Sequence, residues 1–226
     1  KGLWWLYKNH YTHSYLRTFD NSPFMAWNQT SYGSYFASPT ASAIQAFAIN
    51  NHKFKGNPNQ DPYVEAVQLG MNFLMKGYYY SGSYPMLRAL NVSTQHSDNP
   101  EAGQISPNGY GIEVRDYDYR PIYEGGQVMD AIIASGVLPS DLTGRDFTRT
   151  DSTVVANWTF GQLLQDMADM YAYGQCDNTS GSYGIIGGWR YNWGDWPDNS
   201  AAQWAAIGLI PAQKSPWNVI VPDWVK

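Results

Sequence analysis

The chain has 226 residues, of which 15% are charged and 16% aromatic, and its formal net charge at pH 7 is −5. This length supports a real hydrophobic core, and the lack of any Lys/Arg cluster argues against nucleic acid as a partner, because phosphates require a basic track. No apolar run approaches the roughly 20 residues of a membrane-spanning helix, so we expect no membrane span. The single cysteine, Cys176, excludes an internal disulfide and a thiolate cluster for zinc, and we expect it to be buried or half-buried.

The low charge, together with many Tyr, Asn and Ser residues, is typical of secreted and cell-surface proteins. Four sequons for N-glycosylation also favour export; they lie at Asn28, Asn91, Asn157 and Asn178. We expect the Asn157 sequon to fall within a helix, where it would be accidental. Because the chain starts at Lys1, we interpret it as a piece of a longer protein that is secreted or at the cell surface.

Two kinds of helical segment are predicted to alternate along the chain, and the first kind carries long apolar side chains. One copy is the helix end at 1–9, and a clearer copy lies at 61–76, with Asp61 as the N-cap and Pro62 at the first helical position. A third copy is expected at 152–173, capped by Asp151 or Ser152, with its apolar stripe starting at Val155. The tail from 222 is expected to begin another such helix.

The second kind of helix is rich in Ala and Gly and is predicted at 39–51, 123–136 and 199–213. These three segments align from Thr40, Gly125 and Ser200, with apolar residues matching apolar residues. Small side chains allow backbones to approach closely, so we expect these helices in an inner layer, the last one capped by Ser200. The segment 77–120, rich in Tyr, Gly and Pro, is expected to be a long inserted loop.

This alternation predicts an all-α fold of stacked helical hairpins that forms a single domain over 1–226. The "GLWWL" segment near the start and the Gly-Trp loop that leads into "QWAAIGL" resemble the alpha/alpha-toroid superfamily of prenyltransferase and squalene-cyclase repeat proteins. A closed toroid of that family has about six hairpins. We count about three, with a half repeat at each end, so the resemblance implies a partial or open toroid.

The resemblance also implies two chemistries, of which the first is protonation by an acidic cluster of Asp-x-Asp-Asp type. The nearest match is "DYDY" at 116–119, which offers Asp116 and Asp118 but has Tyr at its fourth position. "GDWPD" places Asp195 and Asp198 among aromatic rings, which stabilise carbocations through cation–π contacts. The structural interpretation of this second pair, a turn that caps a helix, is favoured over the catalytic one.

The second chemistry, prenyl transfer, needs a zinc site made of Asp, Cys and His. Cys176 is followed by Asp177, but all four histidines precede it in the chain. His10 and His13 lie three residues apart without a carboxylate at matching spacing and are interpreted as a solvated turn. We therefore expect no metal and no cofactor.

Carbohydrate processing offers another interpretation, because sugars stack on aromatic rings and their hydrolysis needs two carboxylates. The candidate platforms are Trp189, Tyr191, Trp193 and Trp196, and the acids are Glu113, Asp116, Asp118, Glu124, Asp195 and Asp198. No spacing singles out one pair of acids. Large rings at the joints of helical repeats more often fill space between helices, and packing is the favoured interpretation.

We therefore expect a secreted or cell-surface module with a structural, assembly or ligand-binding role, and no intact catalytic motif. The expected partners are other copies of the chain, the remainder of a longer chain, a glycan or an apolar small molecule. The alternative is an enzyme of the terpenoid-cyclase or polysaccharide-processing kind, with Asp116, Asp118, Asp195 and Asp198 as its acids.

Overall fold

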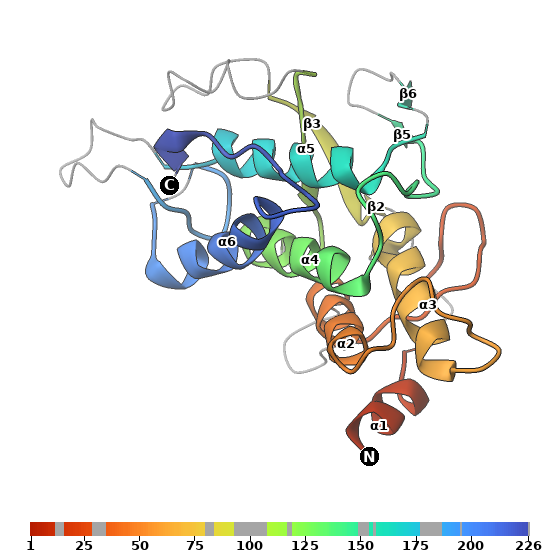
Figure 1. The fold of residues 1–226 in the computed structure, drawn as a ribbon. Helices are drawn as coiled ribbons and strands as arrows, with labels where there is room; N and C mark the ends of the chain where they lie inside the picture. Colours follow the sequence, from red (N-terminus) through yellow and green to blue (C-terminus); the bar gives the residue numbers. More distant parts are fainter. Residues whose placement is uncertain are drawn as a thin grey trace.

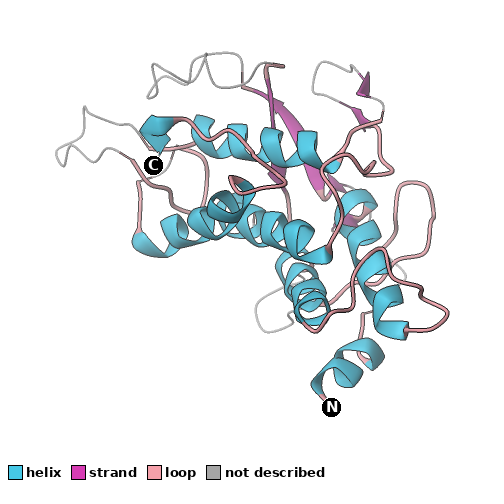
Figure 2. Cartoon of the chain, in the orientation of Figure 1, coloured by secondary structure: helices cyan, strands magenta, loops and turns pink. Residues whose placement is uncertain are grey.

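The computed structural model describes residues 1–11, 16–28, 35–79, 84–92, 108–116, 119–148, 154–155, 157–176, 187–194 and 196–225. These residues are mostly helical (Figures 1 and 2). The helices are α1 (Gly2–Lys8), α2 (Ala37–Ile49), α3 (Pro62–Lys76), α4 (Pro121–Ser135), α5 (Phe160–Tyr173) and α6 (Asn199–Ala212). The expectation of an all-α fold is corrected, because the same residues also contain three antiparallel pairs of short strands.

The Ala- and Gly-rich helices α2, α4 and α6 are neighbours, with α4 between the other two (Figure 1). They run in the same direction: Lys53, just after α2, donates a hydrogen bond to the Ala134 carbonyl at the end of α4, and Tyr123 at the start of α4 bonds Ser200 at the start of α6. The alanines of these helices are mostly buried, as predicted. Those buried are Ala37, Ala41, Ala43, Ala48, Ala131, Ala201, Ala205 and Ala212.

The bulkier helices return antiparallel to the helices that precede them. Phe36 at the start of α2 contacts Phe73 near the end of α3. In the next pair, the Tyr171 hydroxyl near the end of α5 donates to the Ile122 carbonyl at the start of α4. Two helical hairpins, α2/α3 and α4/α5, are thus stacked through their first helices.

The closest helix contact is the one between α4 and α6, and two glycines make it possible. A Cβ atom added to Gly126 would overlap the carbonyl oxygen of Trp204, and one added to Gly208 would lie 2.9 Å from the Gly126 Cα. No side chain therefore fits between the two backbones at this point. The close approach fulfils the expectation that small residues mark the inner helices.

The segment 77–120 was expected to be a loop, and this expectation is wrong for its described residues. These include β1 (Tyr78–Tyr79), β2 (Tyr84–Pro85), β3 (Leu87–Asn91) and β4 (Tyr110–Val114). β3 pairs with β4 in antiparallel register, from Leu87 opposite Val114 to Asn91 opposite Tyr110. β3 contacts α3 and β4 contacts α5, so this hairpin lies between the two bulkier helices.

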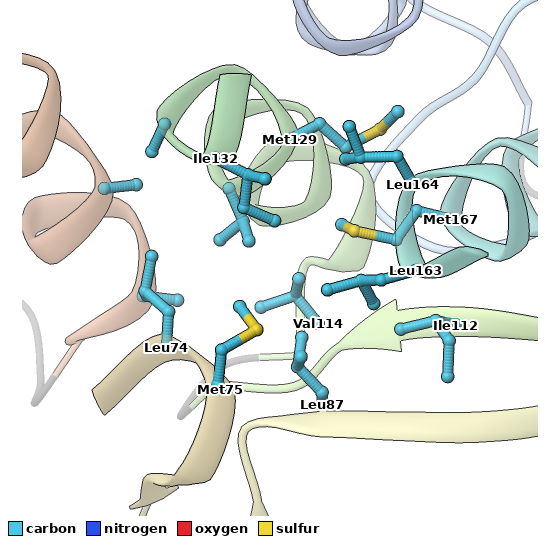
Figure 3. Packing of buried hydrophobic residues seen from close by; sticks show 14 of the residues in the cluster. Leu74, Met75, Leu87, Ile112, Val114, Met129, Ile132, Leu163, Leu164 and Met167 are labelled. Atoms are coloured by element: carbon cyan, nitrogen blue, oxygen red, sulfur yellow. The ribbon is translucent and has the colours of Figure 1, made fainter. Parts of the chain in front are cut away.

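The hydrophobic core joins the hairpin to the helices (Figure 3). Leu87 and Val114 from the strands point toward Met75 of α3 and toward α4 and α5. The labelled core residues from those two helices are Met129, Ile132, Leu163, Leu164 and Met167. Burying side chains of this size contributes about 1.5–3 kcal/mol each, so the hairpin is an integral part of the core.

Two predicted helix boundaries are also corrected. The helix expected at 152–173 begins only at Phe160, because Thr159 and Gln162 form a capping box there. Val154 and Val155 instead form β6, which pairs with β5 (Phe147–Thr148). Asn157 consequently precedes the helix and is exposed, and the predicted tail helix is a single 3-10 turn, η2 (Asp223–Val225).

The predicted helix at 61–76 is confirmed in both its extent and its cap. Asp61 has an extended backbone conformation, and its side chain accepts a hydrogen bond from the backbone N–H of Tyr63 at 2.9 Å. Pro62 occupies the first helical position, where its missing N–H costs no hydrogen bond. Among the residues described above, no helix combines the length and apolar character that a membrane span needs.

We predict that Gly126→Ala lowers the free energy of unfolding by about 1–3 kcal/mol, because α4 and α6 must move apart to admit a methyl group. Urea denaturation of the wild-type and variant proteins measures the difference. Gly2→Ala is the matched control, since nothing lies within 4 Å of a Cβ placed there, and it should change the stability by less than about 1 kcal/mol. Equal stability of the Gly126→Ala variant and the wild type would contradict the close crossing.

Candidate functional site

The candidate site lies at the end of the molecule where α2, α4 and α6 begin. The turn after β4 brings Asp116 to the start of α2, where the backbone N–H groups of Phe36 and Ala37 contact it. Tyr123 and Ser200 join the starts of α4 and α6. Several of the acids and rings singled out in the sequence therefore gather at one end of the parallel helices.

Glu113 is buried, with 1% of its surface exposed, and its two oxygens accept three hydrogen bonds. Arg88, directly opposite on β3, donates its Nε to Oε1 at 2.6 Å. The Tyr119 hydroxyl and the Trp193 indole nitrogen donate to Oε2 at 2.8 and 2.9 Å. Burial and the neighbouring Glu113 carboxylate raise the pKa of Tyr119 above its usual range. Glu113 therefore acts as a hydrogen-bond acceptor that ties together β3, the Tyr119 turn and the Trp193 loop.

Asp116, a predicted candidate acid, is fully buried and holds the start of α2. Its Oδ2 accepts hydrogen bonds from the backbone N–H groups of Phe36 at 2.6 Å and Ala37 at 2.7 Å. The first N–H groups of a helix have no partner within the helix, and a carboxylate there also interacts favourably with the helix dipole. Asp116 thus caps α2 from 80 residues away in the sequence.

Asp198, the second described candidate acid, caps α6. Its Oδ1 accepts from the Ala201 N–H at 2.9 Å and from the Ser200 hydroxyl at 2.6 Å. These two bonds lower the pKa of Asp198 below its usual range. The prediction that Ser200 caps this helix is wrong, because the Asp198 backbone is extended and its carboxylate reaches the free N–H. The remaining candidate acids, Asp118 and Asp195, lie outside the described residues.

Glu124, the other acid named for the carbohydrate interpretation, lies buried in the first turn of α4. Its charge is near the buried Tyr171 ring of α5, whose pKa is raised by burial first and by Glu124 as a further cause. The Tyr171 hydroxyl stays protonated and donates a hydrogen bond to the Ile122 carbonyl. This acid and this phenol therefore belong to the contact between α4 and α5.

The four candidate rings divide into two packed rings and two open ones. Trp189 is buried and donates its indole N–H to the Tyr171 carbonyl at 2.9 Å, and Trp193 donates to Glu113. Both rings meet the Tyr171 ring edge-on, with centroids 5.9 and 5.4 Å away. Tyr191 and Trp196 are 36% and 50% exposed. Trp189 and Trp193 thus fill the junction after α5, whereas Tyr191 and Trp196 are exposed.

Tyr191 is the centre of an exposed surface that was not predicted, here called the aromatic–arginine surface: Arg120, Tyr123, Arg190, Tyr191 and Trp204. The guanidinium carbons of Arg120 and Arg190 lie 5.0 and 5.5 Å from the Tyr191 ring centroid. The Tyr123 ring lies 5.6 Å from Tyr191 and 6.2 Å from Trp204. Both arginines are exposed. Four of these residues escaped the sequence analysis because they come from α4, α6 and the loop between α5 and α6.

The other sequence predictions concern metals and glycans. Among the described residues, no group of three or more His, Cys, Asp or Glu side chains is arranged to hold a metal ion. His10 contacts the Tyr7 carbonyl through Nδ1, and His13 lies outside those residues. Cys176 is buried, as predicted. Asn91 and Asn157 are exposed, Asn28 is partly buried, and Asn178 is not among the described residues.

No protein-family model matches the chain, and comparisons with curated proteins and with solved structures also return no match.

We predict that Asp116→Ala lowers the free energy of unfolding by about 2–3 kcal/mol, because it leaves two buried backbone N–H groups without their acceptor. Thermal or urea denaturation checks this value. Asp130→Ala is the control, since Asp130 is a half-buried acid on α4 whose pKa is raised by burial and which caps no helix. A loss that is no larger for Asp116→Ala than for Asp130→Ala would refute the capping role.

For Asp198→Ala we predict a loss of about 1 kcal/mol at pH 7, the usual value of an N-cap. Because folding lowers the pKa of Asp198, its charge stabilises the protein above the unfolded pKa of about 4. That contribution disappears as the pH falls through the lower folded pKa, so the stabilities of the two proteins should converge as the pH is lowered below about 4. Urea titrations at pH 7, 5 and 3 measure this trend. Asp198→Asn, which keeps a capping oxygen, should lose less at pH 7 than Asp198→Ala.

Proposed function

We propose that the chain is an exported helical-repeat module that binds a ligand on the aromatic–arginine surface and does not transform it. The observation that carries this proposal is that the described acids of the site hold the fold together, whereas its exposed side chains are aromatic and basic. Glu113, Asp116 and Asp198 each accept hydrogen bonds that hold the scaffold. Tyr191, whose ring lies near the guanidinium groups of two exposed arginines, is itself 36% exposed.

The helix arrangement supports a partial toroid as the architecture of this module. Two antiparallel hairpins are stacked through parallel inner helices, which is the pattern that the resemblance implies. The β3–β4 hairpin departs from a plain toroid because it lies between α3 and α5. Such an insertion widens the outer layer at this point, and we propose an open array of hairpins for this reason.

The chemistry of the surface favours an acidic polysaccharide as the ligand. An exposed tyrosine ring offers a flat apolar face against which a sugar ring can stack. Arginine presents a planar fork of donors that matches a carboxylate or sulfate group. Tyr123 and Trp204 extend the aromatic area beside Tyr191. A chain of uronic acid residues supplies both the stacking faces and the anionic groups.

The alternative is an enzyme of the terpenoid-cyclase or polysaccharide-processing kind. Such an enzyme needs a carboxylic acid that reaches its substrate, and a general acid must carry a proton. Glu113 and Asp116 are buried, and each accepts hydrogen bonds that hold the scaffold. The enzyme interpretation therefore depends on Asp118 and Asp195.

We predict that the protein binds polygalacturonate and that this binding weakens at least tenfold, or about 1.4 kcal/mol, in Tyr191→Ala and in Arg120→Gln. Isothermal titration calorimetry at low salt and at 0.5 M salt measures it, and salt should weaken the binding because exposed charges are screened. Fully methyl-esterified polygalacturonate should bind weakly, since it differs only in its neutralised carboxyl groups.

Arg17→Gln is the matched control, because Arg17 is another exposed arginine that lies 5.5 Å from a tyrosine ring, that of Tyr78. This variant also loses one positive charge, but at a residue outside the aromatic–arginine surface, and it should bind polygalacturonate as the wild type does. Equal weakening by Arg17→Gln would reduce the effect to net charge and overturn the proposal. Release of cleaved sugars that is abolished by Asp118→Asn or Asp195→Asn would establish the enzyme alternative instead.

A further inference from the structure

A hollow lies between α1 and α2, away from the aromatic–arginine surface. Its volume is about 380 Å³, which falls in the range of small-molecule sites. The residues that line it are Trp5, Leu6, Asn9, Trp27, Asn28, Pro39, Ser42 and Ala43. We call it the α1–α2 pocket.

The pocket has one fixed aromatic wall and one open aromatic wall. Trp27 is buried; its indole nitrogen donates to the Leu6 carbonyl at 3.0 Å, and its backbone N–H donates to Thr40 Oγ1 at 3.0 Å. Trp5, on α1, also lines the pocket, and 62% of its surface is exposed. A ligand that enters the pocket therefore meets an indole face that solvent covers in the free protein.

The polar groups of the pocket are uncharged. Asn9 and Asn28 contribute amides, Ser42 contributes an exposed hydroxyl, and none of the described lining residues is charged. The Asn28 Oδ1 atom is buried and accepts no hydrogen bond from the described part of the chain. A buried acceptor without a donor costs about 1–3 kcal/mol, and a rotation of the Asn28 amide that brings this oxygen to a ligand hydroxyl would remove that cost.

The internal repeat shows why the pocket exists. The "KGLWWLYKN" segment aligns with "LGMNFLMKG" of α3, so that Trp5 corresponds to Phe73 and Leu6 to Leu74. Phe73 is fully buried against Phe24 and Phe36. Trp5, at the same position of the repeat, is open. The repeat position that Phe73 fills in the core beside α3 is thus occupied in α1 by the larger ring of Trp5, which borders the pocket.

From these features we infer that the α1–α2 pocket binds a neutral pyranose sugar. A pyranose has an apolar face that stacks on an indole ring and a rim of hydroxyls that bond amide and hydroxyl groups, which matches the lining by Trp5, Asn28 and Ser42. The uncharged lining offers no counter-ion to an acidic sugar. This site uses other elements and another ligand charge than the aromatic–arginine surface, and it does not depend on the function proposed for that surface.

The test uses protein produced in bacteria that lack N-glycosylation, so that Asn28 carries no glycan. The probes are the methyl glycosides of glucose, galactose, mannose and N-acetylglucosamine, followed by saturation-transfer NMR and calorimetric titration. We expect saturable binding of at least one of them. Binding should weaken at least tenfold in Trp5→Ala and severalfold in Asn28→Ala.

Trp4→Ala is the matched control, because Trp4 is an exposed tryptophan on the same helix, 51% exposed, that does not line the pocket. This variant should bind within twofold of the wild type. Folding of all variants is checked by circular dichroism; no residue of α1 is buried, so the fold should persist in the α1 variants. Arg120→Gln should leave this binding unchanged, which separates it from the acidic polysaccharide site.

Three results would overturn the inference. They are the absence of saturable binding for all four glycosides, equal weakening by Trp4→Ala and Trp5→Ala, and binding of methyl glucuronide as tight as that of the neutral sugars. Loss of polygalacturonate binding with retained glycoside binding would refute only the proposed function.

Discussion

The contact between the backbones of α4 and α6 is the constraint on which the rest of the site depends. Gly126 and Gly208 allow the two helices to approach until no side chain fits between them. Because the helices are parallel, this approach also brings their first turns together, so that Tyr123 reaches both Ser200 and the Trp204 ring. The aromatic–arginine surface is therefore a consequence of helix packing, and its rings lie on rigid elements and not on loops alone.

Buried carboxylates then fix the connecting segments to these helices. Asp116 joins the turn after β4 to the start of α2, and Glu113 joins the same strand to Arg88 and Trp193. Charges in a protein interior are tolerated only when hydrogen bonds compensate for the lost hydration. Two acids spaced three residues apart thus lock the inserted hairpin to α2 on one side and to the Trp193 loop on the other. Asp116, the described acid of the "DYDY" segment, thus holds the scaffold together with Glu113.

The sequence was sufficient for local features and insufficient for those that depend on distant partners. The helical segments and the Asp61 cap were predictable because helical periodicity and capping are properties of neighbouring residues. The β3–β4 hairpin was missed because its alternating Leu87, Ala89, Ile112 and Val114 are divided between two short segments of a Gly- and Tyr-rich stretch. The role of Asp116 and the meeting of Arg120 with Tyr191 were not predictable, since each joins residues that are 70 or more positions apart.

The two open aromatic groups arise from the same repeat geometry but differ in what surrounds them. Stacked hairpins bury the rings at their internal joints, as Phe73 and Trp193 are buried or partly buried here. Rings at the edges of the array, such as Trp5, or on loops that leave it, such as Tyr191, keep a face exposed. Guanidinium groups lie beside Tyr191, whereas amides and a hydroxyl lie near Trp5. Since an apolar ring supplies contact area and its polar neighbours select charge, the two proposed sites are expected to differ in the class of sugar that they bind.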